Sequence, residues 1–445
     1  MVVIELFHKE TSVPTLTVEK FSCIESASLE LRPVTILIGP QASGKSVLTK
    51  LFYFFAGLLS SQYTSAENGM SLKAYEKKVA RDFAELFPPS AWGRKQFVIE
   101  YTAGKFRCKI SRRATARKIY DETLVEFSAF FKTGYDVLVS EYREATKATK
   151  KQDEFSTHRF NLGWRVQSNS YKRLMKNLGE EFISSQYFVP AGRSFFTNLG
   201  KAIAMLEHGS QLDELTKRFG RVFTTLLDGE NFYYYGDKPP QRIRDFIKSQ
   251  DTETANIFGG DIKLSRNDRH VATFDGRKIP FSVLSSGQQE LLPLILFIRH
   301  FTRMVISDRD KTSDLLYIEE PEAHLFPSAQ DALTAHLAAV SNFTAPSGHM
   351  FITTHSPYVL AKLNTLIKAF LVATLNDGDK KAVEKVIPRA QWLAPARVAA
   401  YALQSGKLAP IKDESGLIDG EYLDSISSDI SADFMALLGI ESGHD

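Results

Sequence analysis

The sequence predicts an α/β protein that combines a mainly parallel sheet, an antiparallel β subdomain and an inserted helical lobe. Three observations support this fold class. An apolar strand at 34–38 runs through a loop of small residues into a helix that starts at 46. Strands and helices alternate between 284 and 370, as in parallel sheets covered by helices. A charged stretch at 118–180, expected to be helical, separates these two regions.

The N-terminal elements follow from local patterns. Residues 34–38, VTILI, are a continuous apolar and β-branched run, which indicates a strand buried on both faces. After Ser46, apolar residues occur with helical spacing at 47, 48, 51, 52, 55, 58 and 59. The stretch 96–110 alternates around Ala-Gly-Lys, which predicts a β-hairpin.

The second half of the chain is expected to return to the sheet. We expect strands at 183–193 and in short segments between 232 and 281, among them FYYYGDK at 232–238. From Leu284 we expect, in order, a helix, a strand at 314–318, a helix at 328–340, a strand at 349–353 and a helix from Pro357. We therefore assign three regions: a head formed by 1–60 and 183–370, an inserted hairpin and helical lobe at 61–182, and a C-terminal helical and tail region at 371–445.

Composition and charge argue against several classes of protein. The net charge is +3, so the chain has no overall basic field that would indicate nucleic-acid binding. Two cysteines, Cys23 and Cys108, are too few for a disulfide framework or a zinc site, and they fit a reducing cytoplasm. The N-terminus lacks the pattern of a signal peptide, and no apolar run reaches the roughly 18 residues that a membrane span needs. We expect a cytoplasmic protein without a membrane partner.

The loop after the first buried strand matches the phosphate-binding pattern G-x-x-x-x-G-K-[ST]. It consists of Gly39, Pro40, Gln41, Ala42, Ser43, Gly44, Lys45 and Ser46, and Val47 continues it into the helix. Glycines let backbone N–H groups face a phosphate, and the N-terminus of the following helix favours the same anion. Lys45 is expected to contact the β- and γ-phosphates, and the Ser46 hydroxyl is placed for Mg²⁺. ATP and Mg²⁺ are therefore the expected cofactors.

Two carboxylates end an apolar strand in the second half of the chain. Residues 315–318, LLYI, are followed by Glu319 and Glu320, which is typical of a Walker B strand. Glu319 is expected to lie near Mg²⁺, and Glu320 to polarise the water that attacks the γ-phosphate. Glu319 is one methylene longer than the aspartate that is usual at this position.

Two further motifs flank this strand. The first consists of Ser285, Ser286, Gly287 and Gln288. With Leu284 it resembles the ABC signature LSGGQ, which implies that Ser285 and the Gly287 N–H complete a nucleotide site on another subunit. His355 ends the next strand, where ABC ATPases keep the switch histidine that contacts the γ-phosphate. His324 lies in the D-loop position, which contacts the partner subunit. Loop, signature, acids and histidine occur in the order of an ABC-type ATPase.

Three longer segments resemble one branch of that class. SSGQQELLPLILF, YIEEPEAHLFPSAQ and FITTHSPYVLAKLN are similar to the stand-alone ATPases related to OLD (overcoming lysogenization defect), and more distantly to RecF and SMC proteins. Among anti-phage defence systems the resemblance is nearest to AriA of PARIS, then to PtuA of Septu and retron systems. It implies a homo-oligomer with nucleotide at subunit interfaces, a separate effector nuclease of Toprim or HNH type, and a phage trigger protein.

The resemblance leaves some features outside its motifs. OLD nucleases carry a Toprim domain, which holds metal with a glutamate on one strand and an Asp-x-Asp pair on a later strand. Asp377 and Asp379 have this spacing, but no such strand and glutamate precede them, so we expect no nuclease domain here. The sequence shows no clear Q-loop, the segment with which ABC ATPases contact Mg²⁺. Gln186 is one candidate for this role, as a Mg²⁺ ligand, and Arg193 is an alternative, as a phosphate sensor.

Two other functions compete with the defence ATPase. A DNA-binding repair ATPase of RecF type is suggested by basic residues of the inserted lobe, and nucleic acid is retained as an optional partner. These residues are Arg112, Arg113, Arg117, Lys118, Lys147, Lys150 and Lys151. A nucleotide-binding subunit of a membrane transporter is disfavoured, because the insertion between the loop and the returning strand is long and polar.

Overall fold

The computed structural model describes residues 12–149, 157–199, 213–227, 240–264, 268–307, 312–375, 380–419 and 431–438. Some expectations lie outside these ranges. They concern the strand FYYYGDK at 232–238, the basic residues Lys150 and Lys151, and the acids Asp377 and Asp379.

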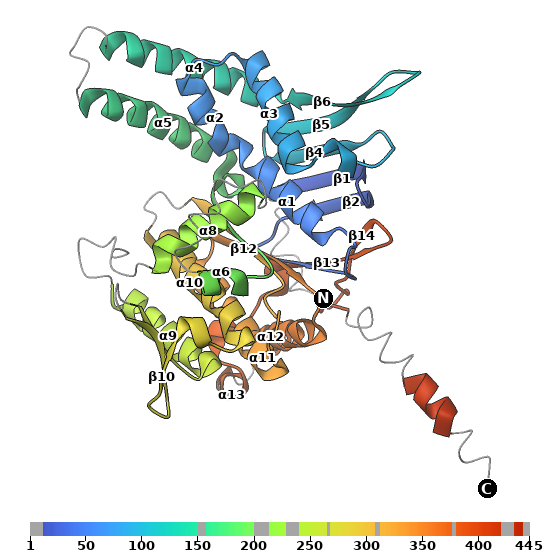
Figure 1. Cartoon of the computed structure of the whole chain (residues 1–445), viewed down its shortest axis with the longest axis vertical. Helices are drawn as coiled ribbons and strands as arrows, with labels where there is room; N and C mark the ends of the chain where they lie inside the picture. Colours follow the sequence, from blue (N-terminus) through green and yellow to red (C-terminus); the bar gives the residue numbers. More distant parts are fainter. Residues whose placement is uncertain are drawn as a thin grey trace.

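A large mixed sheet crosses the molecule (Figure 1). Within the described residues it has eleven strands in the order β6-β5-β4-β1-β2-β14-β13-β3-β12-β11-β7. The bounds are β1 Thr15–Phe21, β2 Ile24–Glu30, β3 Val34–Ile38, β4 Val98–Ala103, β5 Phe106–Ala114, β6 Ile119–Phe127, β7 Ile183–Val189, β11 Ser313–Glu319, β12 Gly348–Thr354, β13 Val398–Gln404 and β14 Lys407–Pro410. The half from β13 to β7 is parallel, and the half from β6 to β2 is antiparallel. The predicted α/β class, a mainly parallel sheet with an antiparallel part, is confirmed.

The parallel half is buried on both faces, as the apolar runs predicted. Every residue of β3, β11 and β12 is buried. Alternate side chains enter two different cores: Tyr317 packs with one hydrophobic cluster and Ile318 with the other. In register, Glu319 lies opposite Thr353, and Thr354 lies opposite Ile38. The carboxyl ends of β3, β12 and β11 therefore meet at one edge of the sheet, the usual place for a ligand site in such folds.

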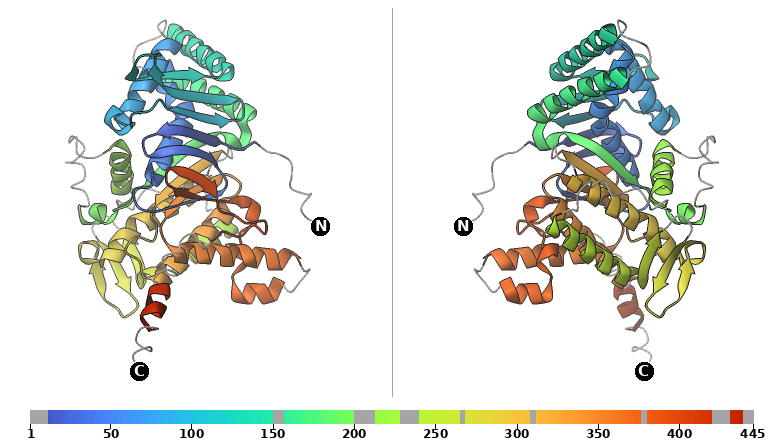
Figure 2. Two further views of the ribbon diagram at one scale, coloured as in Figure 1. Left: turned by 90° about the vertical axis from the view of Figure 1, so that its right-hand side faces the viewer. Right: turned by 90° about the vertical axis from the view of Figure 1, so that its left-hand side faces the viewer.

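Helices cover both faces and extend beyond the sheet (Figures 1 and 2). Their bounds are α1 Lys45–Ala56, α2 Leu58–Glu67, α3 Leu72–Leu86, α4 Ala129–Thr149, α5 Thr157–Leu178, α6 Ser194–Leu199, α8 Glu214–Leu227, α9 Gln241–Phe258, α10 Ser286–Ser307, α11 Pro327–Thr344, α12 Pro357–Leu375 and α13 Lys380–Val386. Short 3₁₀ turns span Pro89–Ala91, Gly179–Glu181, Phe281–Val283, Arg389–Gln391 and Pro395–Arg397. A separate small sheet contains β8 Gly260–Leu264, β9 Arg269–Thr273 and β10 Lys278–Pro280. None of the described helices combines the length and the apolar character that a membrane span requires.

The order of elements predicted from Leu284 onward is confirmed. The structure has α10, β11, α11, β12 and α12 in that order, within a few residues of the expected bounds. The hairpin expected at 96–110 is also present as β4 and β5.

Three secondary-structure expectations were wrong. Residues 119–127, expected to be helical, form the edge strand β6, in which only Phe127 is buried, so the segment lacks the burial pattern of a strand. Residues 241–258 form helix α9, which was not expected. Residues 398–410, assigned to a C-terminal helical and tail region, form β13 and β14 of the main sheet. The hairpin assigned to the inserted lobe is likewise continuous with the main sheet, because β4 pairs with β1.

Candidate functional site

The phosphate-binding loop lies between β3 and α1, and its glycines are required by close packing. A Cβ at Gly39 would lie 2.4 Å from the backbone oxygen of Leu403 on β13. A Cβ at Gly44 would lie 2.6 Å from the Cδ1 atom of Ile24, and Gly44 has a φ of 108°, which L side chains rarely adopt. The loop is therefore held against β13 and against the turn after β1.

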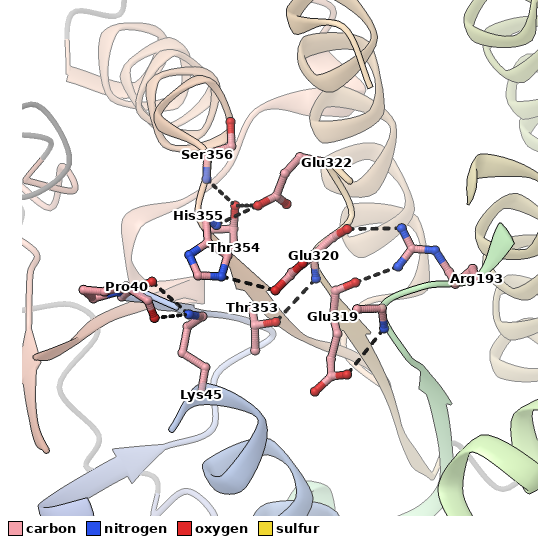
Figure 3. Close-up of polar contacts among 12 residues, drawn as sticks. Pro40, Lys45, Arg193, Glu319, Glu320, Glu322, Thr353, Thr354, His355 and Ser356 are labelled. Atoms are coloured by element: carbon pink, nitrogen blue, oxygen red, sulfur yellow. Dashed lines mark hydrogen bonds and ion pairs between the residues drawn. The ribbon is translucent and has the colours of Figure 1, made fainter. Parts of the chain in front are cut away.

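Lys45 begins α1 and points back across the loop (Figure 3). Its Nζ donates to the carbonyl oxygens of Gly39 and Pro40, both at 2.8 Å. Burial lowers the pKa of Lys45, and the nearby carboxylates of Glu320, Glu322 and Glu319 oppose that change. The ammonium group thus lies at the carboxyl edge of the sheet, between the loop and the acids.

Glu319 and Ser46 lie next to each other at this edge. Glu319 is 7% exposed, and its Oε2 accepts a hydrogen bond from the Ala191 N–H at 3.4 Å. Its Oε1 is buried and makes no hydrogen bond to any described residue. Burial raises the pKa of Glu319, and the Ser46 hydroxyl and Lys50 partly counter this rise. A buried carboxylate oxygen without a donor, beside a hydroxyl, fits a divalent cation.

The protein alone does not supply a full metal site. Within the described ranges, no group of three or more His, Cys, Asp or Glu side chains could hold a metal ion. Mg²⁺ in nucleotide sites is usually held by one or two protein oxygens, with phosphate oxygens and water completing the octahedron. Ser46 and Glu319 fit that arrangement.

Glu320 and His355 face each other (Figure 3). His355 Nε2 lies 3.2 Å from Glu320 Oε1. This hydrogen bond is the main cause that lowers the pKa of Glu320, and Lys45 contributes to the same effect. The Glu320 carboxylate is therefore ionised at neutral pH and is directed toward the loop.

Glu322 belongs to the same site, although it was not among the residues predicted from the sequence. Its Oε1 accepts hydrogen bonds from the His355 N–H at 2.6 Å and from the Thr354 hydroxyl at 2.8 Å. These bonds fix the backbone at the start of α12, just where His355 leaves β12. The sequence Glu-Glu-Pro-Glu at the end of the strand could have indicated Glu322, because it places a third carboxylate two residues after Glu320.

The signature segment starts α10; Ser285 and Ser286 are exposed, and Gly287 and Gln288 are half-buried. Ser285 and Gln288 form a reciprocal helix cap: the Gln288 N–H donates to the Ser285 hydroxyl at 3.4 Å, and the Ser285 N–H donates to Gln288 Oε1 at 3.2 Å. Gln288 also donates to the Phe258 carbonyl, so its side chain is used within the chain. A Cβ at Gly287 would lie 2.8 Å from the backbone oxygen of His324. Signature and D-loop are thus packed together on one surface.

The structure places the two Q-loop candidates elsewhere. Gln186 lies opposite Leu315, four residues before Glu319, and its amide is hydrogen bonded to the Tyr53 carbonyl and the Tyr317 hydroxyl. Its role as a Mg²⁺ ligand is not supported, because the middle of the strand cannot reach the carboxyl edge. Arg193 is fully buried and donates to backbone carbonyls, so it does not face a phosphate.

Comparison with known proteins identifies one matching family. Residues 141–360 match the family described as "AAA ATPase domain". The matched range contains the signature, both acids and His355, and it begins after the phosphate-binding loop. This match supports an ATPase domain in the chain. None of the curated proteins compared with the chain matches it.

Two solved structures are similar at low sequence identity. The SMC head domain from Thermotoga maritima is 12% identical with a TM-score of 0.36, and the alignment covers 90% of this chain and 99% of that one. A structure titled "SmcHead bound to the C-winged helix domain of ScpA" is 12% identical with a TM-score of 0.34, covering 90% and 97% of the two chains.

Proposed function

We propose that this chain binds and hydrolyses ATP at the carboxyl edge of its parallel strands. The proposal rests on the convergence of Lys45, Glu320 and His355 at one site. Lys45 and His355 are more than 300 residues apart in sequence. An ionised carboxylate beside an ammonium group and an imidazole suits a reaction in which water attacks a phosphate. The family match to an ATPase domain supports the same reaction.

Each residue has a separate role in the proposed reaction. The loop N–H groups and Lys45 bind the phosphates, since they combine a helix N-terminus with a positive charge. Glu320 orients the attacking water and accepts its proton. His355 holds the Glu320 carboxylate and lies where it could contact the γ-phosphate. Mg²⁺, when bound by Ser46 and Glu319, would neutralise charge on the β- and γ-phosphates.

Replacement of Lys45 tests nucleotide binding directly. Lys45→Ala removes the ammonium group and should weaken binding of a fluorescent ATP analogue by at least tenfold, measured by titration. Lys362→Ala, on α12 and paired with Asp331, is a matched control that should bind like wild type. Equal affinity of the Lys45 variant and wild type would contradict a phosphate role for this loop.

A second copy of the chain completes the site in this proposal. Ser285 and Ser286 are exposed, whereas Gln288 contacts its own chain. Exposed apolar side chains lie in the same motifs: Val283 before the signature, Phe326 after the D-loop and Tyr358 after His355. Phe326 is 77% exposed. A surface that combines apolar and polar side chains suits association with another copy. Each ATP would then lie between the phosphate-binding loop of one copy and the signature segment of the other.

For the cellular role we propose a sensor and scaffold subunit of an anti-phage defence system that regulates a separate effector nuclease. The resemblance of its motifs to OLD-like ATPases supports this role. Two of the basic hairpin residues that suggested the DNA-repair alternative have acidic partners: Arg112 pairs with Asp121 and Arg113 pairs with Glu122. Partnered charges contribute less to phosphate binding.

Co-expression distinguishes these two roles. The chain should be purified with and without the product of the neighbouring gene, and native mass, ATPase rate and duplex-DNA binding at 50 mM and 200 mM salt should be measured. A homo-oligomer that retains a nuclease-like neighbour supports the defence role. Salt-sensitive DNA binding that stimulates ATP hydrolysis, with no retained neighbour, would favour the repair ATPase.

A further inference from the structure

We propose that Arg193 is a positioning residue that holds the backbone of Glu319 and Glu320 and thereby directs the Glu320 carboxylate at His355. The inference rests on the proposed ATP hydrolysis, and it gives a role to a residue of the segment that follows β7. Arg193 touches neither nucleotide nor water in this scheme. It acts through the peptide groups that carry the two acids.

The guanidinium group binds the end of β11 from within the protein (Figure 3). Arg193 is 0% exposed. Its Nη1 donates to the Glu319 carbonyl at 2.6 Å and to the Pro190 carbonyl at 3.1 Å, and its Nη2 donates to the Glu320 carbonyl at 3.1 Å. Two consecutive peptide groups are therefore fixed by one planar, rigid side chain.

The backbone of Glu320 needs such support. Its φ is 45°, a left-handed conformation that is unfavourable for residues with a Cβ and persists only where neighbours hold it. The Glu320 N–H donates to the Thr353 carbonyl at 2.9 Å, and Arg193 holds its carbonyl on the other side. If this conformation relaxed toward an extended strand, the carboxylate would turn away from His355.

Arg193 is itself held by the signature helix. Glu290, 1% exposed, lies on the second turn of α10, and its Oε2 accepts the Arg193 N–H at 2.8 Å. Arg193 Nε donates to the Glu290 carbonyl at 3.2 Å and lies 3.6 Å from Oε2, so the buried charges are paired. The neighbouring Thr197 hydroxyl donates to the Gln289 carbonyl at 2.7 Å.

This arrangement connects two parts of the site. Residues 190–197 join the acids at the end of β11 to the first turns of α10, which begins with the signature at Ser286. The acids are expected to act on nucleotide bound by their own chain, and the signature on nucleotide bound by the partner. Arg193 therefore sets the orientation of Glu320 relative to the surface that meets the second copy.

Conservative substitution of Arg193 in the full-length protein tests the proposal. Arg193→Lys keeps the positive charge beside Glu290 and loses the planar group that spans two carbonyls. We expect kcat to fall at least tenfold, while the dissociation constant of a fluorescent ATP analogue stays within twofold of wild type.

Matched variants separate positioning from folding. Arg277→Lys, at an exposed arginine paired with Asp275 near β10, should behave like wild type. Glu290→Gln removes the charge that holds Arg193 and should lower kcat less than Arg193→Lys does, again with wild-type nucleotide affinity. Thermal unfolding and circular dichroism identify variants that fold. Should Arg193→Lys fail to fold, Glu290→Gln provides the test.

The outcomes distinguish this inference from the proposed function. If wild type hydrolyses ATP and the folded Arg193→Lys protein has wild-type kcat, the positioning role is wrong. Weaker nucleotide binding with unchanged kcat would also overturn it, and would indicate a phosphate sensor. If wild type itself does not hydrolyse ATP, the proposed function fails first.

Discussion

Replacing Glu320 by glutamine isolates the chemical step. The amide has nearly the same shape and can keep a hydrogen bond to His355, whose Nε2 lies 3.2 Å from the carboxylate. It cannot accept a proton, and a general base typically contributes about 10²- to 10⁴-fold. We therefore expect Glu320→Gln to lower kcat by about 10²-fold or more. Nucleotide affinity should stay near the wild-type value, because the loop and Lys45 are unchanged.

The assay is steady-state phosphate release at saturating ATP and Mg²⁺, with a parallel titration of a fluorescent ATP analogue. Glu384→Gln, at an exposed position of α13, is the matched control and should keep wild-type turnover. A Glu320→Gln protein with kcat within threefold of wild type would refute the role of this carboxylate.

The environment of Glu320 also predicts the pH dependence of turnover. The hydrogen bond from His355 lowers the pKa of Glu320, so the carboxylate stays ionised, and active as a base, below the ordinary range of a glutamate. Loss of that bond in His355→Ala should raise the pKa and move the acidic limb of kcat to higher pH. An unmoved limb would show that another group limits turnover in acid.

Three further substitutions follow from single contacts. Gly39→Ala places a Cβ 2.4 Å from the Leu403 carbonyl, so it should displace the loop and weaken ATP-analogue binding at least tenfold; binding at wild-type strength would contradict this packing. Glu322→Ala removes the acceptor of the His355 N–H and the Thr354 hydroxyl, and should lower kcat several-fold without changing nucleotide affinity; a normal kcat would show that the His355 backbone is held otherwise. Phe326→Asp puts a charge on the proposed contact surface and should abolish ATP-dependent self-association, measured by light scattering; unchanged association would place the interface elsewhere.

Local sequence patterns predicted the parts of the site that depend on consecutive residues. The strands before the phosphate-binding loop, before Glu319 and before His355 each combine a buried apolar run with a polar end. Parallel strands bring such ends to the same edge, so Glu320 and His355 could be expected to meet. Their 3.2 Å contact agrees with that expectation.

Long-range pairing was beyond these patterns. The strand β13, VAAYALQ, is rich in alanine, which has low strand propensity, and nothing near it in sequence indicates that it lies beside β3. Only the structure shows its backbone oxygen at Leu403 against Gly39. The edge strand β6 was likewise taken for helix, because its exposed side chains carry no burial pattern.

The two Q-loop candidates illustrate a related limit. Gln186 was a reasonable choice, because its strand leads to the site. That strand starts at the end of the sheet away from the phosphate-binding loop, however, and Gln186 lies in the middle of the strand. Arg193 does reach the acids, through their backbone carbonyls rather than through solvent. Both residues were expected in one strand at 183–193, whereas β7 ends at Val189 and Arg193 lies after it, so tertiary packing decided what each contacts.

Complementation between two inactive variants tests most directly the central claim, ATP hydrolysis at a site completed by a second copy. Lys45→Ala removes phosphate binding, and Ser286→Glu puts a carboxylate on the exposed signature where the partner's phosphate would lie. Each variant alone should be inactive. Random pairing gives half mixed dimers with one intact site each, so an equimolar mixture should regain about a quarter of wild-type phosphate release. A mixture that stays as inactive as its components would contradict the shared site.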